Sequence, residues 1–209
     1  MILVGQYDSP YVRRVAITLH HYGLAFERNP ISTFTDADAM ARINPLLRIP
    51  SLVLDSGEVL IDSGAILDHL DEVAGPERAL VPLRGPARRT VLQLIAVATG
   101  AIDKAGAAVY ERHFHPPAAV NAEWLRRCLG QLHGALRFLE RQLTGEWLAL
   151  NRFTQADLTT VAMLGYLKLR VPDVDLARDY PGLDRLAEGC ERLPIFAATQ
   201  PAANETMPN

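Results

Sequence analysis

The most constraining feature of this sequence is the stretch of residues 44–66, in which Pro50 directly precedes a short apolar run. The apolar runs 51–54 and 59–61 predict two strands, and the polar residues 55–58 between them have the composition of a hairpin turn. A proline cannot donate a hydrogen bond to a neighbouring strand, so Pro50 is expected at the start of a strand or at a cis peptide bond. The stretch therefore predicts a hairpin that begins immediately after Pro50.

A helix is predicted directly after this hairpin, because apolar residues then recur at helical spacing: Ile66, Leu67, Leu70 and Val73. Ser63 stands where this helix opens. Free backbone N–H groups and the helix dipole favour an anion at such a place, although Ser63 can equally be a helix cap without a ligand. Together with an exposed backbone edge at Ile49, this arrangement suits a small peptide-like ligand that carries a carboxylate.

The order of proline, hairpin, acid-Ser and helix resembles the second half of the glutathione-binding domain of cytosolic glutathione S-transferases. The pattern of that family is approximately Asn-Pro-x-Gly-Lys-Val-Pro-x-Leu, a hairpin, and then acid-Ser-x-Ala-Ile. This chain has Asn44-Pro45-Leu46-Leu47-Arg48-Ile49-Pro50-Ser51-Leu52, followed by Asp62-Ser63-Gly64-Ala65-Ile66. Leu47 stands in place of the usual glycine, Arg48 in place of lysine, and Asp62 in place of the longer glutamate.

The composition narrows the class of protein. The chain has 209 residues, of which 49% are hydrophobic and 22% charged, as in ordinary soluble globular proteins. A net charge of −3 gives no electrostatic case for binding nucleic acid or an anionic membrane. No uninterrupted apolar run approaches the ~20 residues that span a bilayer, and no secretory signal precedes the first strand pattern, so a cytoplasmic location is expected. Two widely separated cysteines, Cys128 and Cys190, argue against a disulfide framework or a zinc site.

The N-terminal part of the chain predicts an alternation of strands and helices. A strand is expected at residues 2–4, a weaker one at 26–31, and a short helix at 36–43. Between the strands, Ser9 and Pro10 have the signature of a helix start, and Gly23 of a helix end. Arg13, Arg14 and Thr18 are expected mostly off the apolar stripe of this helix. The order β-α-β-α-β-β-α up to about residue 74 is the thioredoxin-like arrangement. The strand after Pro50 falls where that fold has its cis-proline, so we expect a cis Ile49–Pro50 bond.

The sequence from residue 75 onward predicts a linker followed by helices. Residues 75–86 are rich in proline and glycine and are typical of a linker; long helices are expected at 87–114 and 119–143. Thr154 and Asp157 form a capping-box pattern at the start of a further apolar helix, and the central C-terminal helix of glutathione S-transferases resembles it. We therefore predict a thioredoxin-like domain at 1–76, a linker at 77–86 and an all-α helical domain at 87–209, with a tail after Thr199 that frays.

The resemblance implies a glutathione transferase that adds the glutathione thiolate to small hydrophobic electrophiles. Ser9 occupies the place where related classes have a reactive cysteine, and its hydroxyl would donate a hydrogen bond to the glutathione sulfur. Tyr7, at the end of the first strand, is the alternative donor, and a Ser9 that only caps the helix is the structural alternative. Glutathione-dependent peroxidase or isomerase activity, and a non-catalytic glutathione-binding or regulatory protein, are the competing functions.

The resemblance also implies a set of binding residues. The Ile49 backbone beside Pro50 would pair with the cysteinyl residue of glutathione, Ser63 and Asp62 would hold the γ-glutamyl carboxylate and ammonium, and Arg48 would reach the glycyl carboxylate. The second substrate is expected against Tyr11, Asp103, Tyr110, His113 and Phe114. No metal site is expected, since His113 and His115 lack a third ligand. A homodimer is expected, as in that family.

Overall fold

The computed structural model describes residues 1–205, which divide into two compact units. The first consists of Met1–Ala79 and the described part of the C-terminal segment from Glu191 onward, and the second is Leu80–Cys190. The boundary near residue 80 lies within the predicted linker. The C-terminal segment, in contrast, groups with the first unit, whereas the sequence placed it in the helical domain.

The first unit is built on a four-stranded sheet with the strand order β2-β1-β3-β4. The strands are β1 (Ile2–Val4), β2 (Glu27–Asn29), β3 (Ser51–Val53) and β4 (Val59–Ile61). β1 pairs in parallel with β2 and antiparallel with β3, and β3 pairs antiparallel with β4. β2 is shorter than the predicted 26–31, since Pro30 has no N–H to continue the ladder.

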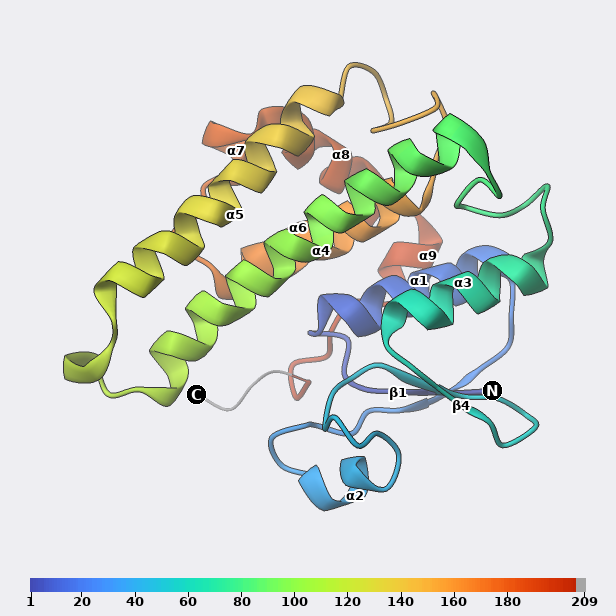
Figure 1. The fold of residues 1–209 in the computed structure, drawn as a ribbon, viewed down its shortest axis with the longest axis horizontal. Coiled ribbons are helices and arrows are strands. Elements are labelled where there is room, and N and C mark those ends of the chain that lie inside the picture. Colours follow the sequence, from blue (N-terminus) through green and yellow to red (C-terminus); the bar gives the residue numbers. More distant parts are fainter. Residues whose placement is uncertain (206–209) are drawn as a thin grey trace. The chain divides into compact units, whose positions relative to one another are not determined.

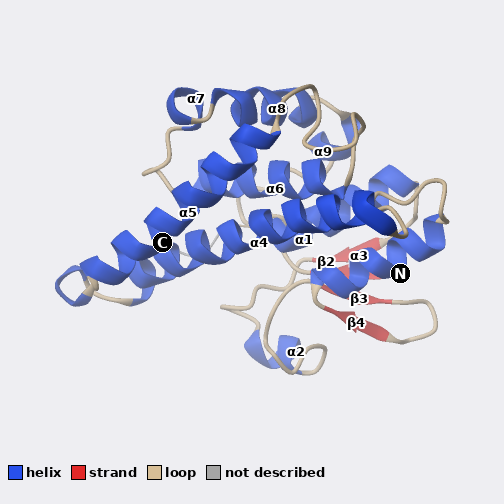
Figure 2. Ribbon diagram, turned by 45° about the horizontal axis from the view of Figure 1, so that its top comes forward, coloured by secondary structure: helices blue, strands red, loops and turns tan. Residues whose placement is uncertain are grey.

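The helices of the first unit lie on both sides of this sheet. Figures 1 and 2 show α1 (Pro10–Tyr22) and α3 (Ser63–Ala74) together on one side, and the short α2 (Ala37–Ala41) on the other. This is the thioredoxin-like arrangement that the order of elements predicts. The three apolar residues Leu3, Leu52 and Ile66, one each from β1, β3 and α3, are fully buried and form part of the core.

Helix α1 begins and ends as its sequence predicts, but its polar side chains are not where we expected them. The side chain of Ser9 caps the helix by accepting a hydrogen bond from the Val12 N–H, and Gly23 ends the helix at φ 67°. The prediction that Arg13, Arg14 and Thr18 lie off the buried stripe was wrong: all three are buried. The helix is covered nearly all round, so its two arginines need partners inside the protein.

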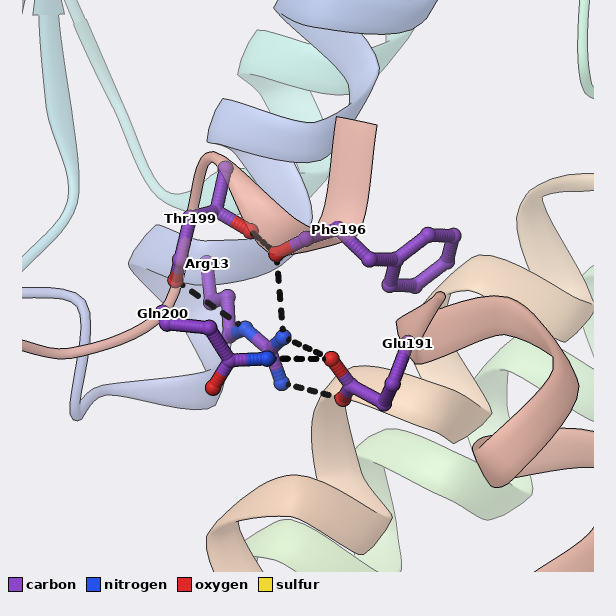
Figure 3. A network of polar contacts seen from close by, with 5 residues as sticks. All are labelled: Arg13, Glu191, Phe196, Thr199 and Gln200. Carbon is purple, nitrogen blue, oxygen red and sulfur yellow. Dashed lines mark hydrogen bonds and ion pairs between the residues drawn. The ribbon is translucent and has the colours of Figure 1, made fainter. Parts of the chain in front are cut away.

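Arg13 finds its partners in the C-terminal segment (Figure 3). Its Nη1 and Nη2 donate to the two carboxylate oxygens of Glu191, at 2.8 and 2.6 Å. Its Nε donates to the Thr199 carbonyl at 3.2 Å, and Nη2 also reaches the Phe196 carbonyl at 3.4 Å. These bonds hold Glu191, the last residue of α8 (Pro181–Glu191), and the short α9 (Pro194–Ala197) against α1.

The chain beyond Thr199 is also held. Glu205 is 6% exposed and accepts hydrogen bonds from the Tyr7 backbone N–H at 2.9 Å and from Arg28 Nη2 at 2.7 and 2.8 Å. The prediction of a fraying tail was therefore wrong for residues 200–205, since Glu205 is held by partners more than 170 positions away in the sequence and Gln200 Nε2 donates to Glu191. Residues 206–209 lie outside the described part of the chain.

The second unit consists of helices. They are α4 (Gly85–Phe114), the 3-10 turn η1 (Pro117–Ala119), α5 (Ala122–Gln142), α6 (Gln155–Arg170), α7 (Leu176–Asp179) and all but the last residue of α8. The two long helices predicted at 87–114 and 119–143 are present, with starts shifted by two or three residues. α4 packs against both α5 and α6, and α6 is buried from Gln155 to Leu164.

One described helix, α4, is long and apolar enough to be a candidate membrane span by length and composition alone, with a mean hydropathy of 1.3 over 18 residues. The mean hydropathy of α4 is high although polar residues interrupt its apolar residues, so the sequence has no uninterrupted apolar run of 18 residues. Core helices of soluble proteins can be equally long and apolar. The packing of α4 against α5 and α6 is typical of such a core helix.

The predicted capping box at the start of α6 is confirmed. Thr154 Oγ1 accepts a hydrogen bond from the Ala156 N–H, while the Thr154 N–H and hydroxyl both donate to Asp157 Oδ2. Asp157 Oδ1 accepts from the Leu148 N–H at 2.7 Å, which ties the preceding loop to the helix. Burial raises the pKa of the Asp157 carboxyl, and these donors act in the opposite direction.

We expect Thr154→Ala to lower the free energy of unfolding by about 2 kcal/mol, at the upper end of the range for a lost N-cap. The reason is that the variant leaves the buried Ala156 N–H without its acceptor and removes one of the two Thr154 donors to Asp157 Oδ2. Thr154→Ser is the matched control, because it keeps the hydroxyl and removes only a methyl group. Denaturant unfolding measures both variants. Equal losses for alanine and serine would contradict this account of the cap.

Candidate functional site

The pairing of β3 with β4 creates a groove at one end of the hairpin. Ser51 pairs with Ile61, so the two residues before Ser51 lie beside the two residues after Ile61. The groove holds about 270 Å³ of empty space, part of it open to solvent. The Ile49–Pro50 peptide bond at its edge is cis, which confirms the prediction for Pro50. Its lining residues are Tyr11, Asn44, Leu46, Arg48, Ile49, Pro50, Ile61, Asp62 and Ser63.

Asn44 organises the loop that forms one wall of the groove. Its buried side-chain amide donates to the Arg48 carbonyl at 2.8 Å, and its Oδ1 accepts from the Leu46 N–H at 2.9 Å. The loop is thereby held from within, and its outward-facing groups are left for solvent or a ligand. The Arg48 guanidinium makes no hydrogen bond or ion pair with any residue of the described chain. The sequence pattern contained Asn44 but did not reveal this role.

Leu47 adopts a conformation that leucine rarely occupies. Its φ of 51° is in the left-handed region, at the position where the family pattern has glycine. A residue with a Cβ there costs roughly 1–2 kcal/mol relative to a right-handed conformation. The rest of the loop, fixed through Asn44, therefore imposes this conformation on Leu47.

The start of α3 forms the opposite wall. Asp62, not Ser63, is the N-cap residue, and its Oδ1 accepts a hydrogen bond from the Gly64 N–H at 2.9 Å. The backbone of Asp62 has an unusual φ of 71°, and both hydrogen bonds that its carboxylate accepts from residues 1–205 are at Oδ1, none at Oδ2. Ser63 is the first residue of the helix, so its N–H lies at the positive end of the helix dipole. Both residues predicted for this wall thus lie at the groove.

Arg14 is the residue of this site that the sequence analysis missed. Its Nη2 donates to Ser63 Oγ at 2.6 Å, although the two residues are 49 positions apart. Burial lowers the pKa of the Arg14 guanidinium to about 10, and Tyr11 and Asp62 act in the opposite direction. The sequence does indicate that Arg14 is buried, because the residues around Arg13 and Arg14 in α1 are nearly all apolar, which is typical of a buried helix.

The first turn of α1 brings Ser9 to the neighbourhood of this groove. Gly5 packs so closely between Val12 and Ile49 that a Cβ would lie 2.6 Å from Val12 Cγ2 and 2.8 Å from Ile49 Cβ. Ser9 is half-buried, and its hydroxyl accepts the Val12 N–H at 3.4 Å but donates to no residue of the described chain. Neither Ser9 nor Tyr7 is among the lining residues themselves.

Tyr7 has a different environment. It is 2% exposed, and the Arg28 guanidinium lies 3.5 Å from the centre of its ring. Burial raises the pKa of the Tyr7 phenol, and Arg28 acts in the opposite direction. Tyr7 is thus part of the packed interior of the first unit.

Of the residues predicted for a second substrate, only Tyr11 lines the groove. The others lie on α4 in the second unit, where all four are exposed. Tyr110 and Phe114 contact each other with ring centroids 5.7 Å apart, and His113 contacts Phe114 at 4.8 Å. Within residues 1–205, no group of three or more histidine, cysteine, aspartate or glutamate side chains is arranged to hold a metal ion.

Comparison with known proteins identifies the family. Residues 3–78 match the glutathione S-transferase N-terminal domain, and residues 122–188 match the glutathione S-transferase C-terminal domain. The chain belongs to the glutathione S-transferase family. Its groove is therefore formed by the N-terminal domain of that family, and its capping box opens a helix of the C-terminal domain.

Solved structures of this family resemble the whole chain. A glutathione S-transferase of Methylobacterium radiotolerans, in complex with glutathione sulfonate, is 31% identical, with 100% of this chain and 97% of that chain covered at a TM-score of 0.91. A glutathione S-transferase of Methylobacillus flagellatus with bound glutathione is 30% identical, with 96% and 99% covered at a TM-score of 0.89. The maleylacetoacetate isomerase of Pseudomonas aeruginosa is 29% identical, with 100% of this chain and 99% of the relative covered.

Proposed function

We propose that this protein is a glutathione transferase that binds glutathione in the groove between residues 44–50 and the start of α3. The observation that carries the proposal is the meeting of two complementary features at the groove: the Ile49 backbone, which makes no hydrogen bond within residues 1–205, and a helix N-terminus at Ser63. A backbone edge pairs with a peptide, and a helix N-terminus binds an anion. The two similar structures with glutathione or glutathione sulfonate bound support the same ligand.

In this proposal each part of glutathione has its own partner. The cysteinyl residue pairs with the Ile49 backbone, and the γ-glutamyl carboxylate binds the hydroxyl and N–H of Ser63. Asp62 Oδ2 faces the γ-glutamyl ammonium, through water if the shorter side chain does not reach. Arg48, whose guanidinium makes no bond within the described chain, binds the glycyl carboxylate.

Ser9 is the proposed activating residue. Its hydroxyl proton has no acceptor among the described residues, so it is available to a glutathione sulfur at the start of α1. A hydrogen bond from Ser9 and the helix dipole both stabilise the thiolate and lower the pKa of the bound thiol. The thiolate then attacks an electrophilic carbon, the S–C bond forms, and the leaving group departs with its electron pair. The burial of Tyr7 favours Ser9 as the donor.

A second candidate reaction is glutathione-dependent isomerisation, which the similarity to a maleylacetoacetate isomerase favours. There the thiolate adds to an activated double bond and is expelled again after rotation, so glutathione is not consumed. Ser9 would activate the thiol in the same way. Product analysis separates the two reactions: transfer depletes free thiol and yields a thioether, whereas isomerisation leaves the free thiol unchanged.

We further propose a cytoplasmic homodimer, because the expected partner of a chain of this family is a second copy of itself. The measurement is the molar mass by light scattering at micromolar concentration. We expect twice the mass of the 23.0 kDa chain, and a monomer mass would contradict the proposal.

Thiol titration tests the proposed roles of Ser9 and Ser63. A hydrogen bond to a charged group contributes about 1.5–3 kcal/mol, which corresponds to roughly 1–2 pKa units or a ten- to hundredfold change in affinity. We expect Ser9→Ala to raise the pKa of bound glutathione by that amount and to change its affinity only a few-fold. Ser63→Ala should weaken binding by ten- to hundredfold and leave the thiol pKa nearly unchanged. Thiolate absorbance against pH measures both quantities.

Tyr7→Phe is the control for the alternative donor. If Tyr7→Phe raises the thiol pKa while Ser9→Ala does not, Tyr7 is the donor and the proposed role of Ser9 is wrong. If neither variant moves it, the protein binds glutathione without activating it, as a non-catalytic binding protein would. Failure of the unmodified protein to bind glutathione would refute the whole proposal.

A further inference from the structure

Two neighbouring arginines of α1 are equally buried but differ in how their charge is balanced. Arg13 and Arg14 are each 4% exposed. The guanidinium of Arg13 is held by both carboxylate oxygens of Glu191 and by two backbone carbonyls. Arg14 makes a hydrogen bond through Nη2 to Ser63 Oγ, whereas its Nε and Nη1 have no partner among the described residues. The chain itself thus neutralises one buried cation and leaves the other incompletely paired.

An incompletely paired buried guanidinium is costly, because its charge loses hydration without a compensating carboxylate. Asp62 is the carboxylate that favours the charged form of Arg14, but its Oδ1 is already engaged in capping α3. Tyr11, which lines the groove, contributes a ring at 5.7 Å from the guanidinium carbon. An anion in the groove at Ser63 would supply the charge that Arg14 lacks.

The bond between Arg14 and Ser63 also fixes the direction of the Ser63 hydroxyl. A hydroxyl has one proton to donate and can accept through its oxygen. Because Arg14 donates to that oxygen, the Ser63 proton points elsewhere, and its acceptor within the described chain is Asp62 Oδ1 at a long 3.4 Å. A ligand carboxylate would offer a better acceptor. Arg14 thus prepares Ser63 to act as a donor.

We propose that Arg14 is a positioning residue for a ligand carboxylate at Ser63, and that it makes the site selective for thiol peptides with a free α-carboxylate on the γ-glutamyl residue. The inference rests on the proposed binding of glutathione. Arg14 acts from behind Ser63: it orients the hydroxyl and places a positive charge near the carboxylate. It does not contact the sulfur, so it governs binding and selectivity and not the reactivity of the thiol.

The test compares two ligands: glutathione and 4-aminobutyryl-cysteinyl-glycine, which lacks only the α-carboxylate. Isothermal titration calorimetry gives the ratio of their dissociation constants. We expect the unmodified protein to prefer glutathione by ten- to a hundredfold or more. Arg14→Met, which removes the charge and keeps a side chain of similar length, should reduce this preference at least tenfold. Arg14→Lys, which restores a positive charge, should discriminate more strongly than Arg14→Met.

Arg13→Met is the matched control. It removes the neighbouring buried guanidinium and leaves the Glu191 carboxylate without its cationic partner, so we expect it to lower the melting temperature and to keep the ligand preference. Arg14→Met should have the opposite pattern, with a melting temperature equal to or above that of the unmodified protein, because the only carboxylate that loses a neighbouring charge is Asp62, which is exposed. If Arg14→Met does not fold, Arg14→Gln takes its place in the ligand comparison.

Each alternative gives a distinct result. If the unmodified protein prefers glutathione and Arg14→Met keeps that preference, Arg14 has only a packing role and the inference is wrong, while the proposed function stands. If the unmodified protein binds both ligands equally, no carboxylate is recognised at Ser63 and the inference is again wrong. If it binds neither ligand, both the proposed function and the inference are refuted.

Discussion

The site depends on the register of one antiparallel hairpin. Because Ser51 pairs with Ile61, the residues that precede β3 and those that follow β4 emerge side by side. A shift of β4 by one residue would turn its side chains to the opposite face of the sheet and displace Ser63 from the Ile49 edge. Two further contacts fix the position of β3: it also pairs with β1, and its Leu52 side chain is buried in the core. The groove is therefore a consequence of how the sheet is assembled.

The two arginines of α1 connect this site to the rest of the first unit. Arg13 binds the C-terminal segment through Glu191, so the segment that leaves the helical unit is anchored on the helix that Ser9 caps (Figure 3). Glu205 adds a second anchor at the Tyr7 N–H, two residues before Ser9. Arg14 faces Ser63 instead. One short helix thus holds the C-terminal segment and supports the groove, through charges that are buried and directional.

The sequence predicted those features that depend on residues close together in the chain. The hairpin, the caps of α1 and the capping box at Thr154 each depend on residues within a few positions, and all were found. The bond between Arg14 and Ser63 and the anchoring of Glu205 join residues 49 or more positions apart, so no local pattern encodes them. Asp62 and Ser63 were found through a family pattern, whereas the roles of Asn44 and Arg14 emerge only when the loop and helix are folded together.

The central claim is that the Ile49 edge and the Ser63 helix start form one binding site for glutathione. Amide chemical shifts of the ¹⁵N-labelled protein during a glutathione titration test it most directly. The account predicts saturable shifts of both the Ile49 and the Ser63 amide signals, with the same dissociation constant, because one ligand contacts both residues. Saturable binding that leaves both signals unmoved, or that moves them with different constants, would contradict it.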